Sequence, residues 1–319
     1  MNFWKKLSAS GGSARGGKKP ILVLAPMAGY TDSAFRLLCR ENGADVVYTE
    51  MISADALYYD SKKTLDMLKF NKKEKPIVCQ LFGKRVEMFP KACQIVEKAG
   101  YSGIDINFGC PAKKVVRHGG GVTLMKDLDK CHEIIKTVIS STKLPVSVKI
   151  RKSIGKITAI DFLKKMKDLD IKAVMIHGRS YENPFSGEID YKIIKQARKY
   201  FKGIIIANGG INSVEQAKVT LEKTGADGLG LARGLFGRPW LFNDIKVQTH
   251  CNASLTKIKK TAIRHAELLY KTKGKKGMFE IRKHLIFYTK GLPNIKQWRD
   301  QMVRVESVAE IKKIFKNLT

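Results

Sequence analysis

ILVLAPMAGYTD (residues 21–32) joins a short apolar run to a turn that lacks the Gly-x-Gly-x-x-Gly pattern of a doubly wound, dinucleotide-binding sheet. Seven similar apolar runs follow, most of them rich in β-branched residues, as expected for strands buried on both faces of a parallel sheet. They read ADVVYTEM (44–51), PIVCQLFG (76–83), GIDINFG (103–109), PVSVKIR (145–151), AVMIHGR (173–179), GIIIANGG (203–210) and GLGLARG (228–234). Helical patterns separate these runs between residues 20 and 245, and together they predict a (β/α)8 TIM barrel.

Two regions flank the predicted barrel. After residue 245 the strand pattern stops, and residues 254–274 and 278–291 carry apolar side chains at helical spacing. Ser307 and Glu310 have the spacing of a capping box that opens a final helix. We therefore predict that residues 246–319 form a small all-helical domain with basic outer faces. Residues 1–19 lack the apolar segment of a secretory signal and are predicted to be a flexible basic tail.

The chain is strongly basic. Its 60 Lys and Arg residues exceed its 29 Asp and Glu residues, which gives a formal net charge of +31. Residues 250–319 contain 17 of the basic and 5 of the acidic residues, so their net charge per residue is more than twice that of the rest. A lysine-rich proteome would explain the total charge but not its concentration. The distribution favours an RNA or DNA surface in the C-terminal segment.

The cysteines and the apolar runs indicate where the protein works. Its six cysteines include no Cys-x-x-Cys pair, which argues against a disulfide framework or a zinc site and is typical of the cytoplasm. No apolar run reaches the roughly 18 residues of a membrane helix. We expect a cytoplasmic protein with no metal, no membrane association and no obligate protein partner.

Polar and small residues gather at the ends of seven of the eight predicted strands, where a barrel builds its active site. A single buried Lys or His is usually a hydrogen-bonded structural residue, but seven strands that deliver such groups to one face predict a ligand site. In strand order, the residues are Pro26, Met27, Ala28 and Gly29; Gln80; Asn107, Cys110 and Pro111; Lys149 and Arg151; His177 and Arg179; Asn208, Gly209 and Gly210; and Ala232, Arg233 and Gly234.

The residue types indicate the ligand. The glycines after the last two strands lie where barrels commonly bind a phosphate through backbone N–H groups, and Arg233 adds a cation. The alternative is that these glycines only let helices pack closely. Gln80 can exchange hydrogen bonds with a planar ring, and Lys149 can neutralise a ring that is rich in electrons. A reduced flavin meets both demands.

Cys110 lies directly after a strand and before Pro111, in a loop that we expect to be fixed. A thiol with an ordinary pKa of about 8.5 is protonated at neutral pH, so it can donate a proton to a developing carbanion. A nucleophilic role would need an adjacent base, and the nearby sequence offers Lys113 and Lys114 rather than His. The role of buried structural cysteine is assigned to the four within strand or helix patterns, Cys39, Cys79, Cys93 and Cys131.

These stretches together resemble the tRNA-dihydrouridine synthases, a family of FMN-dependent (β/α)8 barrels with a C-terminal helical domain. APMAGYTDSAFR (25–36) is similar to the family's opening motif, and INFGCPAKKVVRHGGG (106–121) to its active-site loop. SVKIR, IHGR, IANGGI and GLARGLFGRPWLF resemble its later strand-end motifs in order and spacing. GCPAKKV and IRKHLIFYTKGLP (281–293) are similar to the bacterial B-type branch. Ala232, where many members have Gly, and Gly210, where many have Asp, depart from the pattern.

The resemblance implies a reaction and a role for each matching residue. NADPH would reduce FMN bound in the barrel (20–245), the reduced FMN would pass a hydride to C6 of a tRNA uridine, and Cys110 would protonate C5. His177, the second catalytic residue, would lie near the flavin and the uracil. The expected FMN-binding residues are Pro26, Met27, Ala28, Gln80, Lys149, His177, Asn208, Gly209, Gly210, Ala232 and Arg233. The substrate contacts expected are Asn107, Arg151 and Arg179 in the barrel and Arg282, Lys283 and His284 in the tRNA-binding helical domain (246–319).

Two other functions are compatible with parts of the sequence. A dihydroorotate-dehydrogenase-like oxidoreductase would share the barrel and FMN, but it would act on a free pyrimidine and need no basic helical domain. A catalytically idle tRNA-binding barrel would not need intact Cys110, Lys149 and His177. The sequence therefore predicts a tRNA-dihydrouridine synthase.

Overall fold

The structure, a computed structural model, describes residues 2–9, 19–248 and 254–318. Eight parallel strands close into one barrel, which confirms the predicted TIM-barrel fold. They are β1 (Ile21–Leu24), β2 (Val46–Ser53), β3 (Ile77–Phe82), β4 (Gly103–Phe108), β5 (Val146–Arg151), β8 (Ala173–His177), β9 (Ile204–Asn208) and β10 (Gly228–Leu231). Pairing of β1 with β10 closes the ring, with Leu22 opposite Leu229. A short antiparallel hairpin that the apolar runs did not reveal, β6 (Ser153–Ile154) and β7 (Ile157–Thr158), follows β5.

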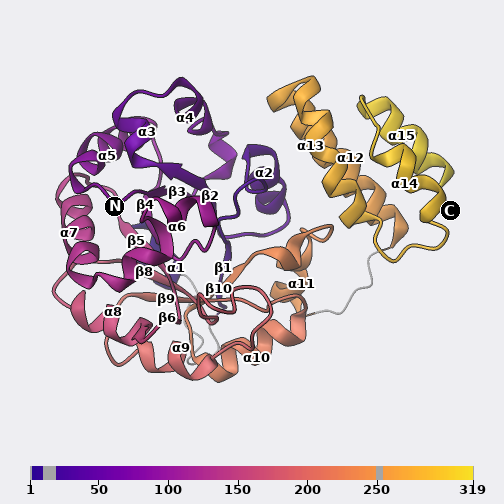
Figure 1. Cartoon of the computed structure of the whole chain (residues 1–319). Coiled ribbons are helices and arrows are strands. Elements are labelled where there is room, and N and C mark those ends of the chain that lie inside the picture. The colour runs from indigo at the N-terminus through magenta and orange to yellow at the C-terminus, as the bar shows by residue number, and fades with distance from the viewer. Residues whose placement is uncertain (1, 10–18, 249–253, 319) are drawn as a thin grey trace.

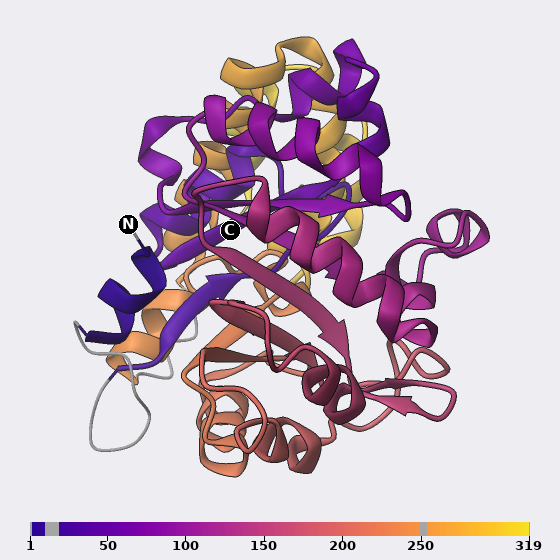
Figure 2. The same cartoon turned by 90° about the vertical axis from the view of Figure 1, so that its left-hand side faces the viewer.

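Helices surround the barrel, as Figures 1 and 2 show. They are α2 (Ser33–Glu41), α3 (Ala54–Tyr58), α4 (Lys62–Met67), α5 (Phe89–Lys98), α6 (Lys113–Arg117), α7 (Leu128–Ser140), α8 (Ala159–Lys165), α9 (Tyr191–Ala197), α10 (Val214–Thr224) and α11 (Leu241–Val247). The helix predicted over residues 213–225 is α10. The Ser213 side chain caps it by accepting a hydrogen bond from the Gln216 N–H, and Gly225 ends it with a φ of +61°.

The prediction of a flexible N-terminal tail is wrong for residues 3–9. Residues predicted to belong to a flexible tail form α1 (Phe3–Ala9), and the Trp4 side chain is 1% exposed. Trp4 packs with Val23 and Val46 in the barrel interior, with Phe3 and Leu7 against the same cluster. Burial of these apolar side chains is a sufficient reason for the segment to fold. Residues 10–18 of the predicted tail lie outside the described residues.

The C-terminal residues form a separate lobe beside the barrel, which confirms that this region is helical (Figure 1). Its helices are α12 (Leu255–Lys273), α13 (Lys275–Tyr288), α14 (Lys296–Met302) and α15 (Val308–Asn317). Ser307 caps α15 as predicted, because it accepts from the Glu310 N–H at 3.2 Å. The reciprocal bond of a capping box takes another form, since the Glu310 carboxylate accepts from the Ser307 hydroxyl at 2.9 Å and from the Glu306 N–H at 3.0 Å. Among the helices within the described ranges, none combines the length and apolar character needed to cross a membrane.

The helical lobe is anchored on α2 through α12 and α13. Arg264 of α12 pairs with Glu41 at 2.6 Å, and Lys273 pairs with Asp32 at 2.7 Å. Between these ion pairs, Phe35 packs against the rings of His265 and His284. The predicted boundary at residue 245 falls inside α11, so the helical lobe begins with α12 rather than at residue 246.

Candidate active site at the barrel mouth

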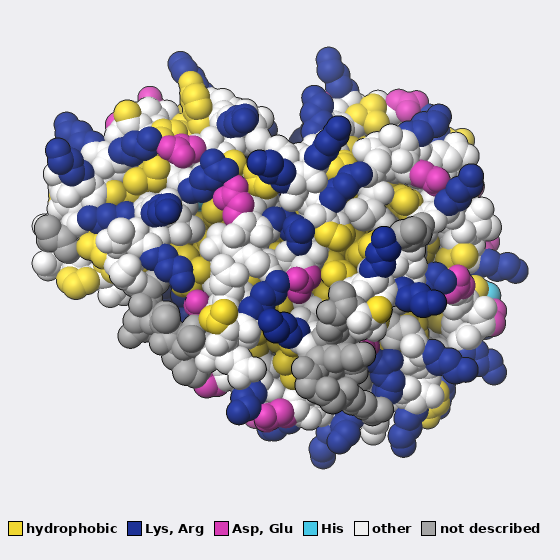
Figure 3. All heavy atoms as spheres, turned by 180° about the vertical axis from the view of Figure 1, so that it is seen from behind, with side chains coloured by type: hydrophobic (Ala, Val, Ile, Leu, Met, Phe, Trp, Pro, Cys, Tyr) yellow, Lys and Arg dark blue, Asp and Glu magenta, His cyan; other side chains and the backbone are white. Residues whose placement is uncertain are grey.

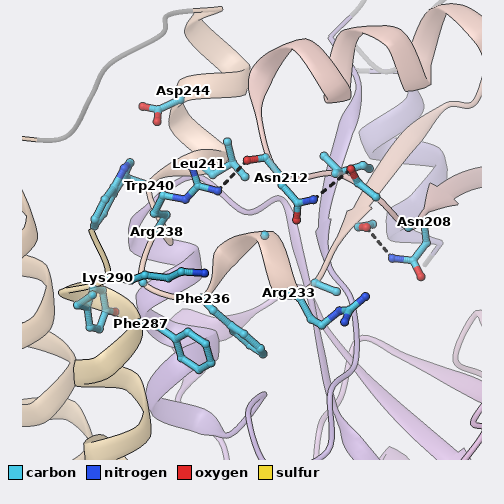
Figure 4. Close-up of a pocket in the computed structure, with 18 of the residues that line it drawn as sticks. Asn208, Asn212, Arg233, Phe236, Arg238, Trp240, Leu241, Asp244, Phe287 and Lys290 are labelled. Atoms are coloured by element: carbon cyan, nitrogen blue, oxygen red, sulfur yellow. Dashed lines mark hydrogen bonds between the residues drawn. The ribbon is translucent and has the colours of Figure 1, made fainter. Parts of the chain in front are cut away.

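The carboxyl ends of the strands surround a cavity of about 920 Å³, a size suited to a small-molecule ligand. A second cavity of about 730 Å³ lies under the loops that follow β9 and β10, and His177, Asn208 and Arg233 line both. Figure 4 shows the second cavity with Arg233 on its barrel side and Phe287 and Lys290 on the side of the helical lobe. The ligand site therefore has two connected parts, one of which reaches the helical lobe.

The structure brings together every residue predicted to bind the flavin. Those that line only the larger cavity are Pro26, Met27, Ala28, Gln80 and Lys149. Those that line the second cavity, four of them shared with the first, are His177, Asn208, Gly209, Gly210, Ala232 and Arg233. Cys110 and two predicted substrate contacts, Asn107 and Arg151, line the larger cavity, and Arg179 lines the second.

The loop that carries Cys110 is held on several sides, as predicted from its position between a strand and Pro111. Asn107 Oδ1 accepts hydrogen bonds from the backbone N–H groups of Gly109 (3.0 Å) and Cys110 (2.8 Å). Arg151 Nε donates to the Gly109 carbonyl at 2.8 Å. Gly121 has a φ of +61°, and a Cβ there would lie 2.7 Å from the Cys110 carbonyl oxygen, so only glycine fits against the loop.

Burial raises the pKa of the Cys110 thiol. A hydrogen bond from the Ala112 N–H and the charges of Lys149 and Arg151 lower this pKa, but they do not outweigh burial. The thiol is therefore neutral at pH 7. The remaining cysteines of the described ranges, Cys39, Cys79, Cys93 and Cys131, are buried and unpaired, as predicted for structural residues. Cys251 lies outside the described residues.

His177 is a neutral imidazole at the barrel mouth. Burial, followed by the positive charges of Lys149, Arg151 and Arg179, lowers its pKa to about 2. The Arg151 guanidinium, which can only donate, lies 3.3 Å from His177 Nδ1, so Nδ1 is assigned as the acceptor and Nε2 as the protonated nitrogen. Burial and the Arg151 charge similarly lower the pKa of Lys149 to about 8, although Asp105 opposes this shift.

Gly209 and Gly210 follow β9 and expose their backbone to the cavity that Arg179 and Arg233 also line. Gly209 and Gly210 have φ values of +112° and +72°, which side chains rarely adopt, and a Cβ on Gly209 would lie 2.8 Å from Ile189 Cδ1. The backbone conformation therefore favours glycine at both positions, whether or not a phosphate binds, while the end of the Ile189 side chain can shift. Arg179 and Arg233 line the same cavity as these glycines, and burial together with the charge of Arg233 lowers the pKa of Arg179.

The structure contradicts one substrate contact predicted in the helical lobe. His284 of α13 is 2% exposed, and its ring packs against those of Phe35, His265 and Tyr30. The prediction that His284 contacts the substrate is wrong, because its side chain is buried where the lobe meets the barrel. Helical spacing alone could have placed His284 on the buried face of α13, since it lies three residues after the core residue Ile281, but it could not have placed it against α2.

The other two predicted contacts of the lobe have different surroundings. Arg282 donates to the carbonyls of Val305 at 3.0 Å and Arg304 at 3.1 Å, so it joins α13 to the segment before α15. Lys283 donates to the Gly29 carbonyl, and its Nζ lies 4.5 Å from the centroid of the Tyr30 ring. Because Tyr30 lines the larger cavity, Lys283 is the predicted contact of the lobe that comes nearest to the barrel mouth.

Residues that the sequence reasoning missed also line the larger cavity. Met51 belongs to β2, while Tyr181, Pro184 and Phe185 come from the loop after β8. Asp105 does not line the cavity itself, but it is 0% exposed and accepts a hydrogen bond from the cavity residue Gln80. A signal for Asp105 was available in GIDINFG, where a carboxylate interrupts an apolar strand.

Residues 23–318 match the family described as Dihydrouridine synthase (Dus). The chain belongs to the dihydrouridine synthase family. It is 34% identical over 298 residues to a probable tRNA-dihydrouridine synthase 1 of Synechocystis, covering 91% of this chain and 83% of that protein. It is 33% identical to tRNA-dihydrouridine synthase B of Pseudomonas aeruginosa, with 89% of this chain and 88% of that protein covered.

Solved structures support the fold. The chain superposes on the old yellow enzyme homologue from Zymomonas mobilis with a TM-score of 0.55 at 14% identity, over 73% of this chain and 90% of that one. The dihydrouridine synthase family comprises flavin-dependent oxidoreductases that form dihydrouridine in tRNA, and this is the enzyme class and reaction assigned to the chain. The family predicted from the motifs is confirmed.

Proposed function

We propose that this dihydrouridine synthase holds FMN across the barrel mouth, uses NADPH as the reductant and protonates C5 of a tRNA uridine from Cys110. One observation carries the proposal. A neutral thiol, fixed in its loop, lines the same cavity as most of the residues predicted to bind the flavin. NADPH is proposed from the resemblance to the family.

The residues around the two cavities fit the parts of FMN. Met27 and Ala28 offer apolar surface, and Gln80 and Lys149 offer polar groups, to a flat ring in the larger cavity. The bare backbone at Gly209 and Gly210, with Arg233 beside it, suits the phosphate. When bound there, FMN supplies the hydride for C6 of the uracil.

The protein's own residues account for the proton. Cys110 holds it at Sγ at neutral pH and releases it to C5, leaving a thiolate. Lys149 and Arg151 lower the pKa of this thiol, so the same two cations stabilise the thiolate after transfer. Neutral His177 offers an Nε2–H to the cavity, where it orients a carbonyl group without adding charge.

The basic surface supports tRNA as the substrate. Lys and Arg side chains are spread over both lobes of the face seen in Figure 3 and outnumber Asp and Glu there. Flipping a uridine out of its stack costs roughly a few kcal/mol. Contacts between phosphates and basic side chains offset this cost, and they weaken as salt is added. We assign most of them to the helical lobe, with Lys283 nearest to the mouth.

Comparing two substrates tests the proposal. The purified protein should bind riboflavin phosphate and show a flavin spectrum. With NADPH it should form dihydrouridine in tRNA from cells that lack this modification, and it should leave free uridine, UMP and orotate unchanged. Reduction of a free pyrimidine at the same rate without RNA would instead establish the dihydroorotate-dehydrogenase-like alternative. A protein that binds no flavin would contradict both.

A further inference from the structure

Three side chains form a hydrogen-bonded chain from the barrel core to the Cys110 loop. Asp105 Oδ2 accepts from Gln80 Nε2 at 2.7 Å, and Gln80 Oε1 accepts from Asn107 Nδ2 at 2.8 Å. Asn107 Oδ1 then accepts the backbone N–H groups of Gly109 at 3.0 Å and Cys110 at 2.8 Å. These are distances of good hydrogen bonds between buried groups.

The direction of each bond in this chain is determined from the loop. Backbone N–H groups only donate, so Asn107 turns its oxygen to the loop and its nitrogen to Gln80. Gln80 must then turn its oxygen to Asn107 and its nitrogen to position 105. The group at position 105 must accept, and a carboxylate accepts in either orientation. Asp105 therefore leaves Gln80 and Asn107 with one fully bonded arrangement.

The surroundings of Asp105 disfavour its ionised form. It is 0% exposed, and its second oxygen accepts from the Ser147 hydroxyl at 2.7 Å. An ionised carboxylate without water is destabilising unless it is hydrogen-bonded and paired. Burial raises the pKa of Asp105 to about 6 despite the bonds from Gln80 and Ser147 and the charge of Lys149, so the carboxylate is ionised above that pH.

We propose that Asp105 is a positioning residue for proton transfer, because through Gln80 and Asn107 it orients the loop that presents Cys110 to the substrate. This inference rests on the proposed role of Cys110 as the proton donor. Without an acceptor at position 105, Gln80 is free to turn, and Asn107 turns with it. The Gly109 and Cys110 N–H groups then lose their acceptor, and the thiol moves from its position.

An exchange of the groups at positions 105 and 107 tests the chain. Asn107→Asp places a carboxylate on each side of Gln80, so one carboxylate must face the amide oxygen. Adding Asp105→Asn reverses the two inner bonds, since the new amide at 105 donates to Gln80 and Gln80 donates to the new carboxylate at 107. The loop N–H groups keep an acceptor. All bonds are then satisfied again, with the same set of side chains.

Two rates separate positioning from general damage in the holoenzyme. In single-turnover reduction of tRNA, we expect Asn107→Asp to be about 100-fold slower than the wild type, as for a misplacement of about 1 Å, and the double variant to recover about tenfold. Alkylation of Cys110 by iodoacetamide without tRNA, followed by mass spectrometry of its peptide, should change in the single variant and return toward the wild-type rate in the double variant. Flavin reduction by NADPH should differ little between the two variants.

Ser147→Ala is the matched control. It removes the other hydrogen bond to Asp105 but leaves the bonds to Gln80, Asn107 and the loop in place, so uridine reduction should slow by about threefold at most. Asp105→Leu, which removes the acceptor altogether, should behave like Asn107→Asp. If Asp105→Leu does not fold, the comparison of Asn107→Asp with the double variant still tests whether the chain positions Cys110.

Specific results would overturn the inference. A double variant as slow as Asn107→Asp, or an unchanged alkylation rate of Cys110 in both variants, would show that the chain does not position the thiol. Equal loss in Ser147→Ala and Asn107→Asp would indicate general damage to the barrel. If the wild-type holoenzyme forms no dihydrouridine in tRNA, the proposed function fails, whereas the alkylation rates still test the chain.

Discussion

The two ends of the barrel use the same strands for opposite purposes. At the amino end, Val23, Val46 and Ile206 pack around Trp4, and the interior is filled. At the carboxyl end, the inward positions two residues beyond Val78, Met175 and Ile206 of the same cluster carry Gln80, His177 and Asn208, which line an open cavity. Alternate residues of a strand face the same side, so a single sheet presents both sets inward. The packed amino end raises the free energy of unfolding, whereas the polar groups needed for chemistry at the carboxyl end lower it.

The largest effect is expected at the carboxyl end. Cys110→Ala should slow dihydrouridine formation in tRNA by about 10²–10⁴-fold, since this is the usual contribution of a positioned acid. NADPH oxidation through the flavin and the melting temperature should change little, because the thiol is not part of the packed core. Full activity on tRNA, measured by mass spectrometry of digested nucleosides, would remove the role assigned to Cys110.

The matching change at the amino end should have the opposite signature. Trp4→Ala should lower the free energy of unfolding by about 3–5 kcal/mol, measured by denaturant titration, with flavin affinity nearly unchanged. Trp4→Phe is the control, because the Trp4 ring nitrogen is buried without a hydrogen-bond partner and phenylalanine removes this nitrogen while keeping a six-membered aromatic ring. A Trp4→Ala variant as stable as wild type would mean that α1 does not help to close the barrel.

The effect of Lys149 on the free energy of unfolding tests whether the polar carboxyl end destabilises the fold. In the flavin-free protein, its folded-state pKa of about 8 lies below the ordinary 10.5, so the unfolded chain binds this proton more tightly. The contribution of Lys149 therefore destabilises the fold at pH 7 and becomes more favourable as pH rises from about 8 to 10.5. Lys149→Met should stabilise the flavin-free protein by about 1–3 kcal/mol at pH 7, a range reduced for solvent screening of this half-buried group. A destabilised variant at pH 7 would contradict this reasoning.

The smallest effect is expected outside the barrel. Lys275 and Lys276 are exposed at the start of α13 in the helical lobe. Changing both to Gln should weaken tRNA binding by about threefold to tenfold and lower the slope of log K against log salt by about two. The same charge removed from α10, by Lys218→Gln with Lys223→Gln, should have no such effect. Equal losses in the two variants, measured by filter binding, would mean that attraction is set by net charge alone.

Much of the fold was predictable because it depends on local patterns. The eight apolar runs, the glycine that ends α10 and the serine that caps α15 all appear at the positions expected. The residues expected to bind the flavin come together for a related reason, since the carboxyl ends of parallel strands meet at one end of a barrel. Errors arose where a segment's own composition misled, as in the Lys- and Gly-rich stretch that contains α1.

By itself, the sequence determined the order of strands and helices, the glycine-rich turns and the place of Cys110 after β4, because residue type and period act over a few neighbours. Only the tertiary structure decided which of the polar residues touch. Asp105 meets Gln80 from 25 positions away, and His284 is buried against α2 across some 250 residues. Such contacts depend on the closure and register of the barrel and on the docking of a second lobe, and no local pattern encodes them.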